Sequence, residues 1–315
     1  MNSSRSENYK VVSEIINCSK NIDDLIQNGH EAHKGIGGTA VKIEINGIPV
    51  FVKQVPVTNL EMDNMYCTKN LFNLPIYYQY GVGSTGFGVW RELEAHQMTT
   101  NWILKGECEN FPITYGYKIV KQKNPQNINE EDLKKYVEYW GSSSEIADRM
   151  KAISSAKYSL YIFMEFIPKT LHEYVQNDSN ANLKIMENDL RSTVNFMNSK
   201  GMIHFDGHGR NILTNGKNLY FADFGLVNCL DFDLTTEEKD FMNKHKTYDL
   251  ALGIDAVCHA LEKSTNPEKN EFLKNYLPIS EKFHEFIMDL RHDNSKSINY
   301  PEYDIDAMLN ENTIS

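Results

Sequence analysis

The arrangement of hydrophobic and polar positions divides the chain into a strand-rich first part and a helix-rich second part. In the first part, alternating runs on either side of Asn46-Gly47 predict a β-hairpin, because this dipeptide suits a two-residue type I′ turn. Further alternating runs predict strands at 111–120 and 158–167, and helical spacing predicts a helix at 90–104. A bridge near 165–168 then leads into the second part.

Helical spacing dominates the second part. It predicts helices at four places, namely 170–176, 181–199, 247–262 and 268–292. A short hairpin at 211–223, with its own Asn215-Gly216 turn, interrupts the helices. The polar and acidic segment 293–315 is expected to be loosely attached to the rest.

Three other segments do not follow this division into a strand-rich part and a helix-rich part. Residues 9–29 predict one or two amphipathic helices, with a buried stripe of Val11, Val12, Ile15, Ile16, Leu25 and Ile26. Residues 56–88 are irregular and rich in Asn, Tyr and Gly. Residues 121–157 form a polar insertion, predicted to hold two helical pieces around a break at Gly141.

Composition limits the partners and the compartment. The 315 residues carry a net charge of −11, which argues against non-specific binding to nucleic acid or to an anionic membrane surface. The five cysteines are odd in number and lack a C-x-x-C pair, which favours free thiols in a reducing compartment. The first residues lack the apolar core of a signal peptide, and no apolar run is long enough to span a bilayer. We therefore expect a cytoplasmic protein with neither nucleic acid nor membrane as partner, of undefined oligomeric state.

The clearest chemical signal lies between Ile203 and Leu226. Asp206 precedes Asn211 by five residues, and Asp223-Phe224-Gly225 follows the predicted hairpin. Phosphoryl transfer from ATP uses a carboxylate near the acceptor hydroxyl and oxygen ligands that hold magnesium. The hairpin returns the chain so that Asp223 can face Asn211 across one magnesium site. The alternative is that these acidic residues only form turns and caps around a tight hairpin.

This stretch resembles the protein-kinase-like superfamily, whose pattern runs H-x-D-x-x-x-x-N and then D-F-G. The resemblance implies an α+β, bilobal fold, with an antiparallel-sheet N-lobe and a mainly helical C-lobe. It also implies ATP and Mg²⁺ as cofactors, with Asp206 orienting or deprotonating the acceptor and with Asn211 and Asp223 holding magnesium. The domains would be an N-terminal extension, the two lobes and a polar tail, at 1–34, 35–167, 168–292 and 293–315.

The resemblance extends upstream of this stretch. Lys53 lies in an apolar strand, where the superfamily has its phosphate-anchoring lysine. A lysine buried there needs a carboxylate partner, for which Glu92 is the first candidate and Glu94 the competitor. The segment 163–175 resembles the hinge between the lobes. There the backbone of Glu165 and Ile167 would meet the adenine edge, and Met164 would guard the back pocket.

Two glycine-rich loops compete for the phosphates. Gly81, Gly83 and Gly86 match G-x-G-x-x-G perfectly, whereas Gly35, Gly37 and Gly38 are followed by Ala40 where the third glycine belongs. Only the imperfect loop directly precedes the hairpin that carries Lys53, as a kinase glycine-rich loop must. We therefore predict phosphate binding by the imperfect loop. The perfect match would support a Rossmann oxidoreductase only if alternating strands and helices followed it, and they do not.

Departures from the pattern affect the choice of acceptor. Phe205 replaces the arginine that many protein kinases have before the aspartate, and the short segment from Gly225 to Asp249 contains no A-P-E. Asp249 itself resembles a structural anchor of the catalytic loop. His208 replaces the usual lysine, as in kinases resembling aminoglycoside phosphotransferases; it would donate to the transferred phosphate or serve only as a loop residue. The sequence slightly favours an atypical serine/threonine-protein kinase. A kinase for small hydroxylated substrates and a pseudokinase scaffold are the alternatives.

Overall fold

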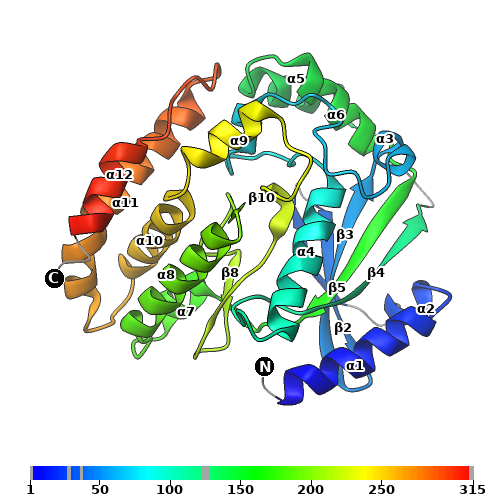
Figure 1. Cartoon of the computed structure of the whole chain (residues 1–315), viewed down its shortest axis with the longest axis horizontal. Helices are drawn as coiled ribbons and strands as arrows, with labels where there is room; N and C mark the ends of the chain where they lie inside the picture. Colours follow the sequence, from blue (N-terminus) through cyan, green and yellow to red (C-terminus); the bar gives the residue numbers. More distant parts are fainter. Residues whose placement is uncertain (1–2, 27–29, 36–37, 123–127, 312–315) are drawn as a thin grey trace. The chain divides into compact units, whose positions relative to one another are not determined.

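The computed structural model describes residues 3–26, 30–35, 38–122 and 128–311. The chain forms two compact units: unit 1 comprises Met1–Pro75 and Thr85–Phe166, and unit 2 comprises Ile76–Ser84 and Ile167–Ser315 (Figure 1). Both combine helices with small antiparallel sheets, so the fold is α+β. Within the described ranges, no helix has the length and apolar character needed to cross a membrane.

Unit 1 is built on a five-stranded sheet in the order β1-β2-β3-β5-β4, in which every neighbouring pair is antiparallel. The strands are β1 (His30–Gly35), β2 (Gly38–Ile45), β3 (Ile48–Val57), β4 (Thr114–Lys121) and β5 (Tyr158–Glu165). Asn46 and Gly47 have φ values of 52° and 76° between the paired residues Ile45 and Ile48. The predicted type I′ hairpin is therefore confirmed.

The helices of unit 1 lie on both faces of this sheet. They are α1 (Ser3–Cys18), α2 (Asp23–Ile26), α3 (Asn59–Asp63), α4 (Val89–Leu104), α5 (Glu130–Tyr139) and α6 (Ser144–Ser154). Trp90 and Leu93 of α4 form one buried cluster with strand residues, against which Tyr117 of β4 also packs. Side chains alternate along a strand, so Gly116 faces the other side, where Ile16 of α1 covers it.

Unit 2 is mainly helical. Its helices are α7 (Leu171–Asn177), α8 (Leu183–Ser199), α9 (Thr236–Asn243), α10 (Tyr248–Leu261), α11 (Lys269–His292) and α12 (Glu302–Glu311), and its 3₁₀ turns are η1 (Ile76–Gln79) and η2 (Phe224–Leu226). Its short strands are β6 (Lys169–Thr170), β7 (Met202–Ile203), β8 (Ile212–Thr214), β9 (Leu219–Phe221) and β10 (Asn228–Cys229). The helix α10 packs against α7, α8 and α11 (Figure 1). The hairpin β8–β9 is the one predicted at 211–223.

Two segments differ from the sequence-based expectation. Within the predicted tail, residues 302–311 are not loosely attached, because α12 packs on α11 and buries Ile305 and Leu309, which lie one helical turn apart. Tyr300 adds to this attachment by stacking on His245. Residues 76–84 lie within the irregular 56–88 segment expected in the first lobe, yet they belong to unit 2. They are attached to unit 2 by ring contacts of Tyr80 with Phe241, His245, Tyr248 and Phe286. No short-range sequence pattern predicts these contacts.

Candidate active site

In unit 1, β3 and α4 bring Lys53 and Glu92 together. The Lys53 Nζ donates a hydrogen bond to Glu92 Oε1 at 2.6 Å, and both side chains are buried. Glu94, the competing candidate, is exposed. Lys53 points toward α4 because alternate residues of β3 face this helix, and its burial among apolar strands requires the opposite charge. The carboxylate partner predicted for Lys53 is therefore Glu92.

A buried histidine lies behind this ion pair, and the sequence analysis missed it. The Nε2 atom of His96 is 4.0 Å from Glu92 Oε1, and its Nδ1 is 3.3 Å from the hydroxyl of Thr114 on β4. His96 is fully buried. Its position four residues after Glu92 on α4 is the signal that could have identified it, since such residues share one face of a helix.

The predicted hinge residues Met164 and Glu165 end strand β5. Met164 is buried in the core cluster under α4. The backbone N–H of Glu165 donates to the carbonyl of Ile113 at 2.8 Å, so this N–H is already engaged within the sheet. Arg5 of α1 donates to the Glu165 carboxylate at 2.6 Å and to the carbonyl of Phe111 at 2.7 Å. The N-terminal helix therefore fixes the strand end that precedes Ile167, the buried residue where unit 2 resumes.

The glycines of the predicted phosphate loop are only partly described. Gly37 lies outside the described residues, and Gly35 pairs with Gly38 at the ends of β1 and β2. Gly38 has a φ of 133°, and a β-carbon there would lie 2.1 Å from the carbonyl oxygen of Gln54. Glycine at position 38 is therefore required by the sheet itself. A substitution there would distort the sheet whether or not phosphate binds nearby.

The perfect glycine pattern is divided between the two units. Gly81 and Gly83 belong to unit 2, whereas Gly86 belongs to unit 1. No parallel strand pair accompanies it in the described part of the chain, where all paired strands are antiparallel. A Rossmann unit needs parallel strands on either side of such a loop. The structure therefore argues against the dinucleotide-binding alternative.

In unit 2, one loop brings Asp206 and Asn211 together. The Asn211 side-chain amide donates to Asp206 Oδ2 at 2.9 Å and to the Asp206 carbonyl at 3.0 Å. The hairpin β8–β9 returns beside this loop, because the N–H of Ala222 donates to the Asn211 carbonyl at 2.9 Å. Asp223 follows directly and accepts a hydrogen bond from the N–H of Gly225.

Asp249 at the start of α10 is hydrogen-bonded to the backbone of the same loop. Its carboxylate accepts hydrogen bonds from the backbone N–H groups of His204, at 2.6 Å, and Phe205, at 2.8 Å. Burial raises the pKa of Asp249 to about 6, while these two hydrogen bonds act in the opposite direction. Phe205 has a φ of 61° and Asp223 has a φ of 64°. Such left-handed backbone at non-glycine residues costs on the order of 1–3 kcal/mol each and is often found at functional sites.

His208 lies beside Asp206. Its Nε2 is 3.8 Å from Asp206 Oδ1, and its Nδ1 accepts a hydrogen bond from the N–H of Arg210 at 3.2 Å. Burial lowers the pKa of His208, so the neutral imidazole is the form favoured at neutral pH. Because Nδ1 is an acceptor, the proton of the neutral ring is assigned to Nε2. His208 therefore directs an N–H toward the side of the loop where Asp206 lies.

A cavity of about 380 Å³ within unit 2 opens at this loop. The loop residues Asp206, His208 and Gly209 line it together with residues of α10 and α11. Gly81 also lines it and approaches Asp206 closely. Next to Gly81, the Tyr80 hydroxyl lies 2.9 Å from His245 Nε2, which fixes the segment 76–84 on unit 2. The cavity gives a small polar group access to the Asp206 carboxylate.

No protein-family model matches the chain, and no curated protein matches it. The functional assignment therefore depends on the side chains of the two units and on their chemistry.

Proposed function

We propose that this protein is an ATP- and magnesium-dependent phosphotransferase that transfers the γ-phosphate to a hydroxyl acceptor. The observation that carries the proposal is the loop of unit 2, where Asp206 is hydrogen-bonded to Asn211 and a hairpin returns the chain to Asp223. Unit 1 contributes the buried Lys53–Glu92 pair. A phosphate-anchoring cation, an acceptor-side carboxylate and two oxygen ligands for magnesium are the groups that phosphoryl transfer uses.

The donor atoms suit magnesium. Asn211 uses its amide nitrogen on Asp206, so its amide oxygen is the atom that can serve as a ligand. The Asp223 carboxylate is the second oxygen ligand, and hard cations prefer such oxygens. Bound magnesium would neutralise charge on the phosphates, and Lys53 is the phosphate-anchoring residue that the resemblance implies. Asp206 would orient the acceptor hydroxyl and accept its proton, and the Nε2–H of His208 would donate to the transferred group.

The acceptor that we propose first is a serine or threonine of a protein. The second candidate is a small hydroxylated compound, which the cavity beside Asp206 and His208 favours. A volume of about 380 Å³ accommodates either a small molecule or one side chain. Incubation with labelled ATP and magnesium, alone and with a panel of small hydroxylated acceptors, followed by mass spectrometry of the products, distinguishes these acceptors.

Two variants test the chemistry itself. We expect Asp206→Asn to keep nucleotide affinity nearly unchanged while the transfer rate falls by roughly 10²–10⁴-fold, since it removes a positioned acid–base group and keeps the shape. We expect Asp223→Ala to abolish magnesium-dependent turnover in a protein that stays folded. Calorimetric ATP binding and a transfer assay measure both. Unchanged turnover in folded Asp223→Ala protein contradicts the proposal, as does loss of nucleotide binding in Asp206→Asn.

A further inference from the structure

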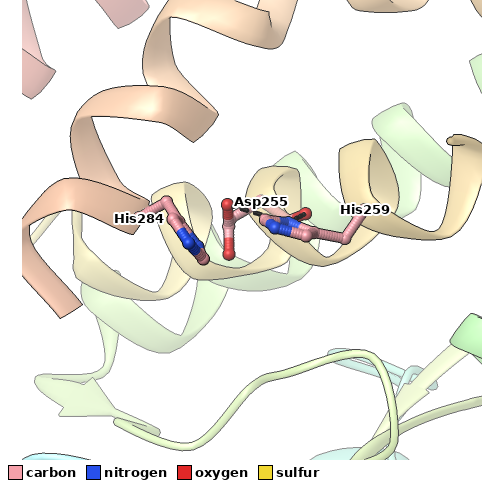
Figure 2. Close-up of side chains that lie close together, drawn as sticks. All are labelled: Asp255, His259 and His284. Atoms are coloured by element: carbon pink, nitrogen blue, oxygen red, sulfur yellow. Dashed lines mark hydrogen bonds and ion pairs between the residues drawn. The ribbon is translucent and has the colours of Figure 1, made fainter. Parts of the chain in front are cut away.

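Two helices of unit 2 bring two histidines and an aspartate to one point (Figure 2). Asp255 and His259 lie one turn apart on α10, and His284 extends toward them from α11. One ligand atom of each side chain lies within 4.8 Å of the other two. In a tetrahedral site with ion–ligand distances of about 2.0–2.2 Å, the ligand atoms lie closer to one another than 4.8 Å. Small side-chain rotations would therefore bring these three atoms to the distances that an ion requires.

Neighbouring groups orient these side chains. The Ser280 hydroxyl of α11 donates to Asp255 Oδ1 at 2.7 Å. The Nδ1 atom of His259 lies 3.0 Å from the backbone carbonyl of Asp255 and 3.2 Å from its Oδ1. Hydrogen bonds of this kind set ring and carboxylate orientation around protein-bound metals. His284 is exposed, with its ring centroid 4.8 Å from that of His259, so it has room to adjust.

We propose that Asp255, His259 and His284 bind one divalent transition-metal ion of the zinc type, which links α10 to α11. Two imidazoles and one carboxylate form a donor set for zinc and related ions, whereas magnesium prefers oxygen ligands alone. Three protein ligands leave a fourth position for water or for a bound molecule. This proposal does not depend on the proposed phosphotransferase activity.

The position of the site gives the ion access to the Asp206 cavity. Asp255, His259 and His284 all line the same cavity as Asp206 and His208. The fourth position of the ion would therefore be open to the same solvent and to the same small molecules. An ion pair between Asp255 and His259 alone would explain those two residues, but it gives no role to His284. A variant at His284 therefore separates the two interpretations.

The test uses the full chain after treatment with a chelator and dialysis. Isothermal titration with Zn²⁺ is expected to show one equivalent bound per chain, and Co²⁺ is expected to give the intense visible absorption of a four-coordinate site. His284→Ala and Asp255→Asn should each weaken Zn²⁺ binding at least tenfold. His292→Ala, an exposed histidine two turns further along α11, is the matched control and should bind as the wild type does.

Two further measurements separate this site from the proposed magnesium site and from a purely structural effect. Asp223→Ala should retain Zn²⁺ binding, and excess Mg²⁺ should not displace Zn²⁺. At the same Zn²⁺ concentration, the melting temperature of the wild type should rise more than that of folded His284→Ala protein, because only the native state holds the ligands together. No stoichiometric Zn²⁺ binding by the wild type, equal affinity in His284→Ala, or displacement of Zn²⁺ by Mg²⁺ would each overturn the proposal.

Discussion

Gly81 lies directly against the carboxylate of Asp206. A β-carbon at position 81 would be 2.6 Å from Asp206 Oδ1 and 3.2 Å from the carbonyl oxygen of Phe205. The backbone of Gly81 is not in the left-handed region, so close approach is the reason for glycine here. The segment 76–84 therefore supports the Asp206 loop, although two of its residues, Gly81 and Gly83, belong to a G-x-G-x-x-G match.

In the proposed phosphotransferase, we expect Gly81→Ala to lower the transfer rate by about 10²-fold, since displacing a group that acts on the acceptor by about 1 Å has this effect. The added methyl group would push the Asp206 carboxylate out of its hydrogen bond with Asn211. Nucleotide affinity, measured by calorimetry, should change only a few-fold. Gly83→Ala is the control, because nothing lies within 4 Å of a β-carbon there, although its φ of 105° makes alanine strained. A Gly81→Ala enzyme with the wild-type rate would contradict this role.

Removal of the Lys53 ammonium should affect both ligand binding and stability. Lys53→Ala leaves the buried carboxylate of Glu92 without this cation, which costs about 3–5 kcal/mol of unfolding free energy. ATP affinity should fall as well if Lys53 anchors the phosphates. The double variant Lys53→Ala/Glu92→Gln should regain part of the stability but none of the ATP affinity. Tryptophan fluorescence can follow unfolding, because Trp90, Trp102 and Trp140 all belong to unit 1. Equal stability of the single and double variants would show that the buried charge is not the cause.

The insertion 121–157 has a structural role that can be tested at Arg149. This residue of α6 pairs with Glu61 at 3.3 Å, and both side chains are buried. The same Glu61 oxygen accepts the N–H of Val89, the first residue of α4, the helix that carries Glu92. We expect Arg149→Met to lower the unfolding free energy of unit 1 by about 3–5 kcal/mol, as tryptophan fluorescence during urea unfolding would show.

The matched control for Arg149 is an exposed ion pair in the same insertion. Lys135 and Glu131 on α5 lie 2.8 Å apart, and both are largely exposed. Lys135→Met should change the unfolding free energy by less than about 1 kcal/mol, because exposed pairs contribute little. Similar effects of Arg149→Met and Lys135→Met would mean that the insertion does not stabilise the start of α4.

Features set by neighbouring residues could be predicted from the sequence. The Asn46-Gly47 hairpin and the helix that begins beside Trp90 both follow from short-range patterns. Contacts between distant residues could not be predicted in this way. The approach of Gly81 to Asp206 joins positions 125 residues apart (206 − 81) and depends on how Tyr80 packs against His245.

The cluster of Asp255, His259 and His284 shows the same limit in another form. The spacing of Asp255 and His259 on one helix is visible in the sequence, but only the packing of α10 on α11 adds His284. Likewise, the acidic composition of 293–315 gave no sign that Ile305 and Leu309 would bury one face of α12. Tertiary packing decided both outcomes, and local pattern was insufficient.

Two buried histidines should make unit 2 sensitive to acid. Burial lowers the pKa of His204 and of His245 from 6.5 to about 4. As the pH falls, the unfolded chain binds these protons near pH 6.5, whereas the folded protein binds them only near pH 4. The contribution of the two histidines to the free energy of unfolding is therefore complete above pH 6.5 and is lost as the pH falls through 4. Each histidine accounts for a loss of about 3 kcal/mol. Asp249 has the opposite effect, because its raised pKa of about 6 means that the folded protein binds this proton before the unfolded chain does. As the pH falls, Asp249 therefore stabilises the folded state by about as much as one of the two histidines destabilises it.

His245 is the residue at which this prediction can be tested, because it lies outside the Asp206 loop. Its ring stacks on Phe241 and on Tyr300, and its Nε2 lies 2.9 Å from the hydroxyl of Tyr80. Lys244 is the nearby cation, and it also lowers the pKa of His245.

His245→Gln keeps a polar group for Tyr80 and removes the titration. Its unfolding free energy should therefore be lower at pH 7 but should fall less than that of the wild type between pH 7 and pH 4.5. Far-UV circular dichroism during urea unfolding measures this difference, because it includes the helices of unit 2, whereas all three tryptophans lie in unit 1. His292→Ala, with an exposed side chain, should keep the wild-type pH dependence, and an equally steep fall in His245→Gln would show that another group causes the acid sensitivity.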